Sequence, residues 1–150
     1  MQRTGFAGDD CPVARALDAI GDWWSLLIVR DAFDGLRRFG DFQRNLGIAK
    51  GMLTARLRKL VELGVLEQVA ASDGSAYQEY ALTKKGHALF PVVVSLRQWG
   101  EANLFARGEP HSVLVDAQGE RVGQLVLPSK AGRPLAWSET RVRKVAARKR

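Results

Sequence analysis

Residues 36–86 restrict the possible folds of this chain of 150 residues more than any other stretch. Apolar residues recur at helical spacing over residues 39–46 and again over residues 50–63, which predicts two short amphipathic helices. Gly47 lies between the two helices and Gly64 follows the second, and a glycine at such a place is typical of a helix end. Two helices separated by so short a break indicate a helix-turn-helix unit.

A strand pair is expected directly after the second helix. Residues 65–69 and 77–82 have the composition of short strands, and the sequence Ser-Asp-Gly-Ser at residues 72–75 favours a turn between them. A hairpin at this place is a wing. The sequence therefore predicts a mainly α fold with a small β part, a winged helix-turn-helix.

The helix at residues 50–63 has two chemically different faces. At about 100° per residue, its apolar face consists of Leu53, Leu57, Leu60 and Val61. Its polar face combines small residues with long cations: Lys50, Gly51, Thr54, Ala55, Arg58 and Lys59. Such a face can approach base edges in the major groove of DNA, so we expect residues 50–63 to form a recognition helix.

Positive charge concentrates in the same region. The formal net charge is +7, and residues 36–60 contain seven Lys and Arg but only one acidic residue. Residues 108–150 contain nine Lys and Arg against four acidic residues. This distribution favours a polyanionic partner, which the helix pattern identifies as double-stranded DNA.

The residues of this region have different expected roles at DNA. Cations before or at the start of the recognition helix are expected to contact phosphates: Arg37, Arg38 and Lys50. Arg58 and Lys59 can each contact a phosphate or a guanine edge. Thr54 and Ala55 are short enough to let the helix approach a thymine methyl group. An orienting residue of the preceding helix and an aromatic residue of the wing complete the expected set: Gln43 and Tyr77.

Other helices flank this unit. The spacing predicts one helix opening at Pro12 and a second over residues 23–33, which is apolar almost all round and is expected in the core. Thr83 favours the start of a last helix over residues 84–105, in which Pro91 predicts a kink.

The ends of the chain differ from its middle. Residues 1–10 are polar and are expected to be a flexible N-terminus. Residues 107–140 are expected to form an extension rich in β-structure, with a hairpin around the turn at residues 116–119. Residues 141–150 hold six Lys and Arg and no acid, which predicts a basic tail.

An ordered series of short motifs runs through residues 11–103. Its first part consists of Cys11-Pro12, Gly21-Asp22-Trp23-Trp24, Leu26-Leu27-Ile28, Phe39-Gly40-Asp41-Phe42, Leu46-Gly47-Ile48 and Leu53-Thr54-Ala55-Arg56-Leu57. Its second part consists of Leu60, Gly64-Val65-Leu66, Glu79-Tyr80-Ala81-Leu82-Thr83, Gly86, Pro91-Val92 and Trp99-Gly100. In this order and spacing, the series resembles the HxlR-type winged helix-turn-helix transcription regulators.

The resemblance implies a partner and an assembly. Proteins of that family bind operator DNA as homodimers and dimerise through their first and last helices. The resemblance thus implies a DNA-binding and dimerisation domain over residues 11–106, whose long last helix is the dimerisation helix. We expect a homodimeric transcription regulator that represses rather than activates. Since no long apolar segment is present, we expect it in the cytoplasm.

Two places depart from the pattern of that family: the start of the recognition helix, where Gly51 also replaces a larger residue, and the wing. Ala49 stands where a serine is common, so the recognition helix lacks a capping oxygen at a cost of about 1 kcal/mol. In the wing, Ala76 and Tyr77 stand where Pro-Arg is usual, so an arginine for the minor groove is absent.

Cys11 supports an alternative function. Some relatives use the cysteine at this place as a thiol sensor, because a helix N-terminus stabilises a thiolate. With one cysteine, the reaction would be an intersubunit disulfide, a mixed disulfide or an alkylation. The competing interpretation is a cysteine that only packs.

Further alternatives concern ligands and protein partners. Aromatic residues of the second and last helices could line a pocket for a small-molecule effector, although core or interface packing explains such residues more often: Trp23, Trp24, Phe33 and Trp99. The wing, poor in cations, could instead dock a protein. His87 and His111 have no neighbouring ligand residues, so we expect no metal site and no cofactor. No catalytic motif is present, and an enzyme is not expected.

Overall fold

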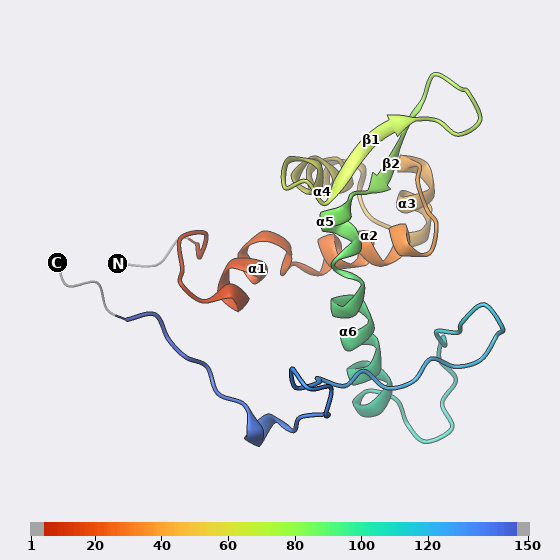
Figure 1. Cartoon of the computed structure of the whole chain (residues 1–150). Helices are drawn as coiled ribbons and strands as arrows, with labels where there is room; N and C mark the ends of the chain where they lie inside the picture. The colour runs from red at the N-terminus through yellow and green to blue at the C-terminus, as the bar shows by residue number, and fades with distance from the viewer. Residues whose placement is uncertain (1–4, 147–150) are drawn as a thin grey trace. The chain divides into compact units, whose positions relative to one another are not determined.

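The predicted helices and wing are present in the computed structural model, which describes residues 5–146 (Figure 1). Four helices precede the wing: α1 (Pro12–Ile20), α2 (Trp23–Phe33), α3 (Phe39–Leu46) and α4 (Lys50–Glu62). The wing consists of β1 (Leu66–Ala70) and β2 (Gln78–Leu82). It is followed by α5 (Lys84–His87), α6 (Phe90–Asn103) and the short 3-10 helix η1 (Trp137–Glu139). The chain divides within α6 into two units, residues 1–93 and 94–150, which are described separately.

The core of the first unit lies where α2, α3, α4 and the wing meet. Its most buried side chains are Ile28, Val29, Phe42, Ile48, Leu53, Leu57, Leu60, Val65 and Leu66. The apolar face predicted for α4 is therefore the face that packs on this core. Each fully buried leucine contributes roughly 2 kcal/mol to folding by leaving water.

Helix α2 contributes Ile28 and Val29 to the core, as the sequence predicted, and only its first residue is exposed. Trp23 is exposed over 73% of its surface, whereas Ser25 and Asp31 are fully buried. The buried polar side chains are satisfied: the Asp31 carboxylate accepts hydrogen bonds from Arg30 and from the Asn45 amide of α3, the latter at 2.8 Å. Polar contacts thus hold α2 in place where the sequence indicated apolar packing alone.

The wing is an antiparallel hairpin in which Leu66 pairs with Leu82 and Ala70 with Gln78. The loop between the strands extends away from the helices (Figure 1). Gly64 has a φ of +73°, a conformation that lets the chain turn from α4 into β1 and that favours glycine. The wing thereby follows the recognition helix directly, as predicted.

The helix expected over residues 84–105 is two helices. Thr83 caps the first, its hydroxyl oxygen accepting a hydrogen bond from the Gly86 amide at 3.1 Å, as the sequence indicated. Pro91 is the second residue of α6, where the first helical turn needs no amide hydrogen. It therefore occurs where a new helix begins instead of kinking a continuous one.

The N-terminal segment is held against α1 in its described part. The Phe6 amide donates to the Asp18 carboxylate at 2.9 Å, and the Asp9 amide donates to the Phe6 carbonyl at 2.9 Å. Asp18 thus supplies an acceptor on α1 for the backbone of this segment, and the flexibility expected of residues 1–10 stays a prediction. Residues 1–4 lie outside the described residues.

The C-terminal extension contains isolated bridges in place of the expected β-structure. Val115 bridges Arg121 across the predicted turn, and Pro128 bridges Pro134. Within residues 107–140 these two bridges do not extend into a longer ladder, and Gln98 of α6 bonds to the backbone of two residues there. Its side-chain amide donates to the Gly123 carbonyl at 2.9 Å and accepts from the Leu125 amide at 2.8 Å. Of the predicted basic tail, residues 141–146 have no regular structure and residues 147–150 lie outside the described part.

Two further findings concern the described range as a whole. None of the helices within residues 5–146 has the length and apolar character that a membrane span requires. In the same range, no group of three or more His, Cys, Asp or Glu side chains is arranged to hold a metal ion.

Candidate nucleic-acid interface

The polar face of α4 is on the outside of the first unit. Leu53 and Leu57 point into the core, and the residues expected at DNA lie on the other side of the helix: Lys50, Gly51, Thr54, Ala55 and Arg58 are exposed and Lys59 is half-buried. The Thr54 hydroxyl donates to the Lys50 carbonyl at 2.8 Å, which holds it against the helix backbone. The structure therefore brings the expected residues of α4 together on one accessible face.

The turn before α4 has the geometry expected of the sequence. Gly47 adopts a φ of +61°, and its amide donates to the Gln43 carbonyl at 2.9 Å to close the end of α3. Ala49 is the N-cap residue of α4 and gives it no side-chain hydrogen bond. Free amide groups thus remain at the start of α4, where a helix attracts anions.

The polar face of α4 continues onto the wing through a shallow groove. The groove has a volume of about 250 Å³ and is lined by Thr54, Arg58, Val61, Glu62, Gln68 and Tyr80. Across the hairpin, the Gln68 amide donates to the Tyr80 hydroxyl at 3.3 Å. Residues of β1 and β2 therefore border the same surface as Arg58.

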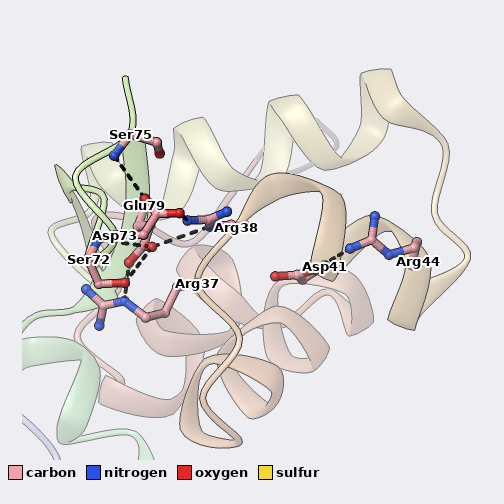
Figure 2. Close-up of polar contacts among 8 residues, drawn as sticks. All are labelled: Arg37, Arg38, Asp41, Arg44, Ser72, Asp73, Ser75 and Glu79. Atoms are coloured by element: carbon pink, nitrogen blue, oxygen red, sulfur yellow. Dashed lines mark hydrogen bonds and ion pairs between the residues drawn. The ribbon is translucent and has the colours of Figure 1, made fainter. Parts of the chain in front are cut away.

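A buried carboxylate ties the wing to the segment before α3 (Figure 2). Glu79 of β2 is only 2% exposed, and the Arg37 guanidinium donates to it at 2.6 Å. Arg38 donates to the other carboxylate oxygen at 3.4 Å and also forms an ion pair with Asp73 in the wing loop. The Ser72 hydroxyl donates to Glu79 at 3.0 Å. We call these five residues the wing latch.

The wing latch shifts the protonation of its two carboxylates. The hydrogen bond from Arg37, aided by Ser72, lowers the pKa of Glu79 to about 2, although loss of hydration opposes the shift. The hydrogen bond from Arg38 holds the pKa of Asp73 well below its usual range. Both carboxylates are therefore charged at neutral pH, so the ion pairs of the wing latch are present there.

The latch changes the role expected for Arg37 and Arg38. The sequence suggested phosphate contacts for both, but in the structure both guanidinium groups are paired with carboxylates of the wing. A carboxylate as buried as Glu79 needs opposite charge beside it, because a lone buried charge is very costly. These arginines hold the wing, and because their side chains stay 44% and 41% exposed, the phosphate contacts expected of them stay a prediction.

Sequence reasoning missed Glu79 as a structural residue. The sequence shows Glu79 as part of a family motif, and the strand pattern around it is a further signal of burial. In β2 it alternates with Gln78 and Tyr80, so an inward-facing strand position is acidic, and such a residue requires a partner. The partners could not be found by pattern, since Arg37 is 42 residues away along the chain.

The wing tip and α3 form the other side of the candidate interface. Tyr77 is 76% exposed in the wing loop, and Gln43 is half-buried on α3. A second groove, of about 750 Å³, lies between them and is lined by Arg38, Phe39, Gly40, Asp41, Arg44, Ser72, Tyr77, Gln78 and Glu79. Arg44 forms an ion pair with Asp41 in this groove (Figure 2).

The residues of the alternative functions belong to several elements, α1, α2 and α6. Cys11 is exposed at the N-cap of α1, and its amide donates to the Asp9 carboxylate at 2.8 Å. Phe33 packs against His87 and Phe90, with ring centres 6.1 and 5.1 Å apart, respectively. The two tryptophans of α2 contact each other edge to face, and Trp99 belongs to the other unit.

A helix-turn-helix with an exposed cationic second helix, followed at once by a hairpin, defines a winged helix-turn-helix protein of the DNA-binding type. Comparison with protein families agrees, since the model for the HxlR-like helix-turn-helix matches residues 19–107. The chain belongs to the HxlR family, which consists of transcription regulators and is not a class of enzymes.

Relatives and solved structures extend this likeness. An uncharacterized HTH-type transcriptional regulator of Mycobacterium tuberculosis, MT3179, is 50% identical over 92 residues, covering 61% of this chain and 58% of the relative. This chain thus spans less than two thirds of that relative. PA1607, a protein proposed to be a transcription factor, is 55% identical, with a TM-score of 0.87 over 92% of this chain and 97% of its own. The oxidized redox regulator HypR is 35% identical, with a TM-score of 0.57 over 64% of this chain and 100% of its own.

Proposed function

We propose that this chain is a sequence-specific transcription regulator that binds operator DNA as a homodimer, with α4 in the major groove. The main support is a contrast between paired and unpaired cations. Of the seven cations in residues 36–60, four form ion pairs with carboxylates: Arg37, Arg38, Arg44 and Arg56. Within residues 5–146, the cations of this region without an ion pair are those of the polar face of α4: Lys50, Arg58 and Lys59. Charge available for phosphates and bases is therefore concentrated on the predicted recognition helix.

Exposed apolar side chains support dimerisation through the first and last helices. Val13 and Leu17 of α1 are 66% and 61% exposed, and Leu96 and Trp99 of α6 are 52% and 61% exposed. Apolar faces of this kind gain free energy when a second subunit covers them. In a dimer, two α4 helices would meet half-sites about one or two helical turns apart, roughly 34 or 68 Å.

Repression requires only that the dimer occupies promoter DNA. A dimer bound across a promoter excludes other proteins from the same DNA and needs no further contact, whereas activation requires a surface for the transcription machinery. A regulator of this kind would act in the cytoplasm, where the DNA of a prokaryote lies.

Fluorescence anisotropy on duplexes that tile the DNA upstream of this gene tests the proposal, with scrambled duplexes at physiological salt as the control. We expect about a thousandfold preference for one fragment. Equal affinity for every duplex, falling steeply with salt, would contradict sequence-specific regulation. Absence of DNA binding would favour a protein-interaction module instead.

A redox-gated regulator is the second candidate, and the exposure of Cys11 at a helix N-terminus favours it. The related HypR structure is described as that of a redox regulator, and the likeness covers 64% of this chain and 100% of HypR. If Cys11 is the sensor, an oxidant changes operator affinity of the wild-type protein, whereas the affinity of Cys11→Ser stays constant. A Cys11→Ser protein that still responds to oxidant would eliminate this candidate and point to another effector, such as a small molecule among the aromatic residues.

A further inference from the structure

Residues 107–140, which we call the arm, carry many apolar side chains but have no core of their own. None of these residues is buried. Seven large apolar side chains are exposed over 37–88% of their surface: Val113, Val115, Val122, Leu125, Val126, Leu127 and Trp137. With typical side-chain areas, they leave roughly 700 Å² of apolar surface in water, close to what each partner of a standard protein interface buries.

The arm nevertheless has a defined course, which polar contacts impose. At its start, Arg97 of α6 donates to the Ser112 hydroxyl at 2.9 Å. Further along, Gln98 bonds to the backbone of Gly123 and Leu125. A local turn closes the far end, where the Ser129 amide donates to the Arg133 carbonyl at 2.7 Å. Polar contacts thus fix the course of the arm, whereas its large apolar side chains stay largely exposed.

A related protein aligns with much of the arm. The likeness to PA1607 covers 92% of this chain, so it must include much of the arm, because the family model ends at residue 107. An arm without a core needs an external surface to keep its apolar side chains out of water. A surface available to both proteins is that of a second copy of the same chain.

From these observations we infer that the arm packs its apolar side chains against a second copy of this chain. The inference rests on the proposed homodimer and adds to it: α1 and α6 form one part of the interface, and the arm forms another. Continuity supports this occupant. The arm is anchored on α6 through Gln98, and Leu96 and Trp99 of the same helix are exposed, so the arm and the proposed α6 interface belong to one unit.

The first test measures the dimer dissociation constant of the full-length protein by sedimentation equilibrium. The change is the double substitution Val126→Asp and Leu127→Asp, at two adjacent residues that are 62% and 61% exposed. We expect the dissociation constant to rise at least tenfold, because charge replaces apolar contact in both subunits. The matched control, Val126→Leu with Leu127→Met, keeps the surface apolar and should dimerise like the wild type. A double Asp variant that dimerises as tightly as the control would overturn the inference.

The second test identifies the contact directly. A photo-cross-linking amino acid replaces Trp137, which is 88% exposed, in an equal mixture of ¹⁴N- and ¹⁵N-labelled full-length chains. We expect cross-linked peptides in which the arm of a ¹⁴N-labelled chain is joined to a peptide of a ¹⁵N-labelled chain. Cross-links confined to single chains would show that the arm folds onto its own first unit, and would reject the inference while leaving DNA binding and the homodimer intact. A wild-type protein that stays monomeric at all concentrations would reject both the arm contact and the proposed homodimer.

Discussion

Arg58 on the polar face of α4 allows the clearest test at the scale of single residues. We expect the double variant Arg58→Ala/Lys59→Ala to bind its operator at least tenfold more weakly, because a bidentate contact to guanine is worth about 1–3 kcal/mol. Anisotropy titrations of the single variants Arg58→Ala and Lys59→Ala at several salt concentrations separate the roles of the two residues. Loss of a phosphate contact weakens all duplexes alike and lowers the salt slope by about 1, whereas loss of a base contact weakens only the operator.

Lys84→Ala is the matched control for these variants. Lys84 is exposed on α5, outside the candidate interface, so its removal also takes away one positive charge and should leave operator affinity nearly unchanged. Unchanged affinity in the double α4 variant would contradict the proposed recognition helix.

Asp22 is a residue whose loss should reduce stability. Its carboxylate caps α2, accepting from the Ser25 amide at 2.9 Å, and it pairs with Arg56 of α4 at 3.1 Å. Burial alone would raise the pKa of Asp22, but the hydrogen bonds from Ser25 and the charge of Arg56 lower it overall. We expect Asp22→Ala to reduce the free energy of unfolding by about 1 kcal/mol, measured by urea denaturation. Asp22→Asn keeps the capping oxygen and should lose less; an equal loss would mean that the ion pair, not the cap, dominates.

The wing is the structural element whose position depends most on charge. In the folded protein the pKa of Glu79 is about 2, against an ordinary value of 4.5. The carboxylate therefore stabilises the fold fully above pH 4.5, and this contribution disappears as the pH falls through 2. We expect the thermal midpoint of Glu79→Gln to lie below that of the wild type at pH 7, and the difference to shrink as the pH falls from 4.5 towards 2.

Thermal unfolding followed by circular dichroism across this pH range checks the prediction. A constant difference between Glu79→Gln and the wild type at every pH would mean that the ion pairs of the wing latch do not stabilise the fold. Glu67→Gln is the matched control: Glu67 lies on the exposed side of β1, and its removal should have little effect at any pH.

At the scale of the whole molecule, the basic tail should add affinity without adding specificity. Residues 141–150 hold six Lys and Arg. We expect their removal to weaken binding to operator and scrambled duplexes by the same factor and to lower the salt slope, because counterion release does not depend on sequence. Anisotropy with both duplexes measures the two effects together. A loss restricted to the operator would show instead that the tail reads bases.

Local rules made much of the fold predictable from the sequence. The spacing of Leu53, Leu57 and Leu60 indicated the buried face of α4, and the glycines at 47 and 64 indicated the helix ends, because helix periodicity and left-handed turns depend on residues a few positions apart. The order of the helices and the wing along the chain was predictable as well, because each element is set by residues a few positions apart. The exposed face of α4 was predictable as well, since it is the complement of the buried one.

Contacts between distant residues were decided by the tertiary structure. Charge counting placed Arg37 and Arg38 among the phosphate contacts, but both are paired with Glu79, about forty residues further along the chain. Likewise, the apolar stretches of residues 107–140 suggested strands, whereas the structure has two isolated bridges there and two backbone contacts to Gln98 of α6. Sequence thus determined which elements form, because that choice is local. The tertiary structure decided which charges remain available to a partner, because an ion pair depends on distance in space and not on position in the chain.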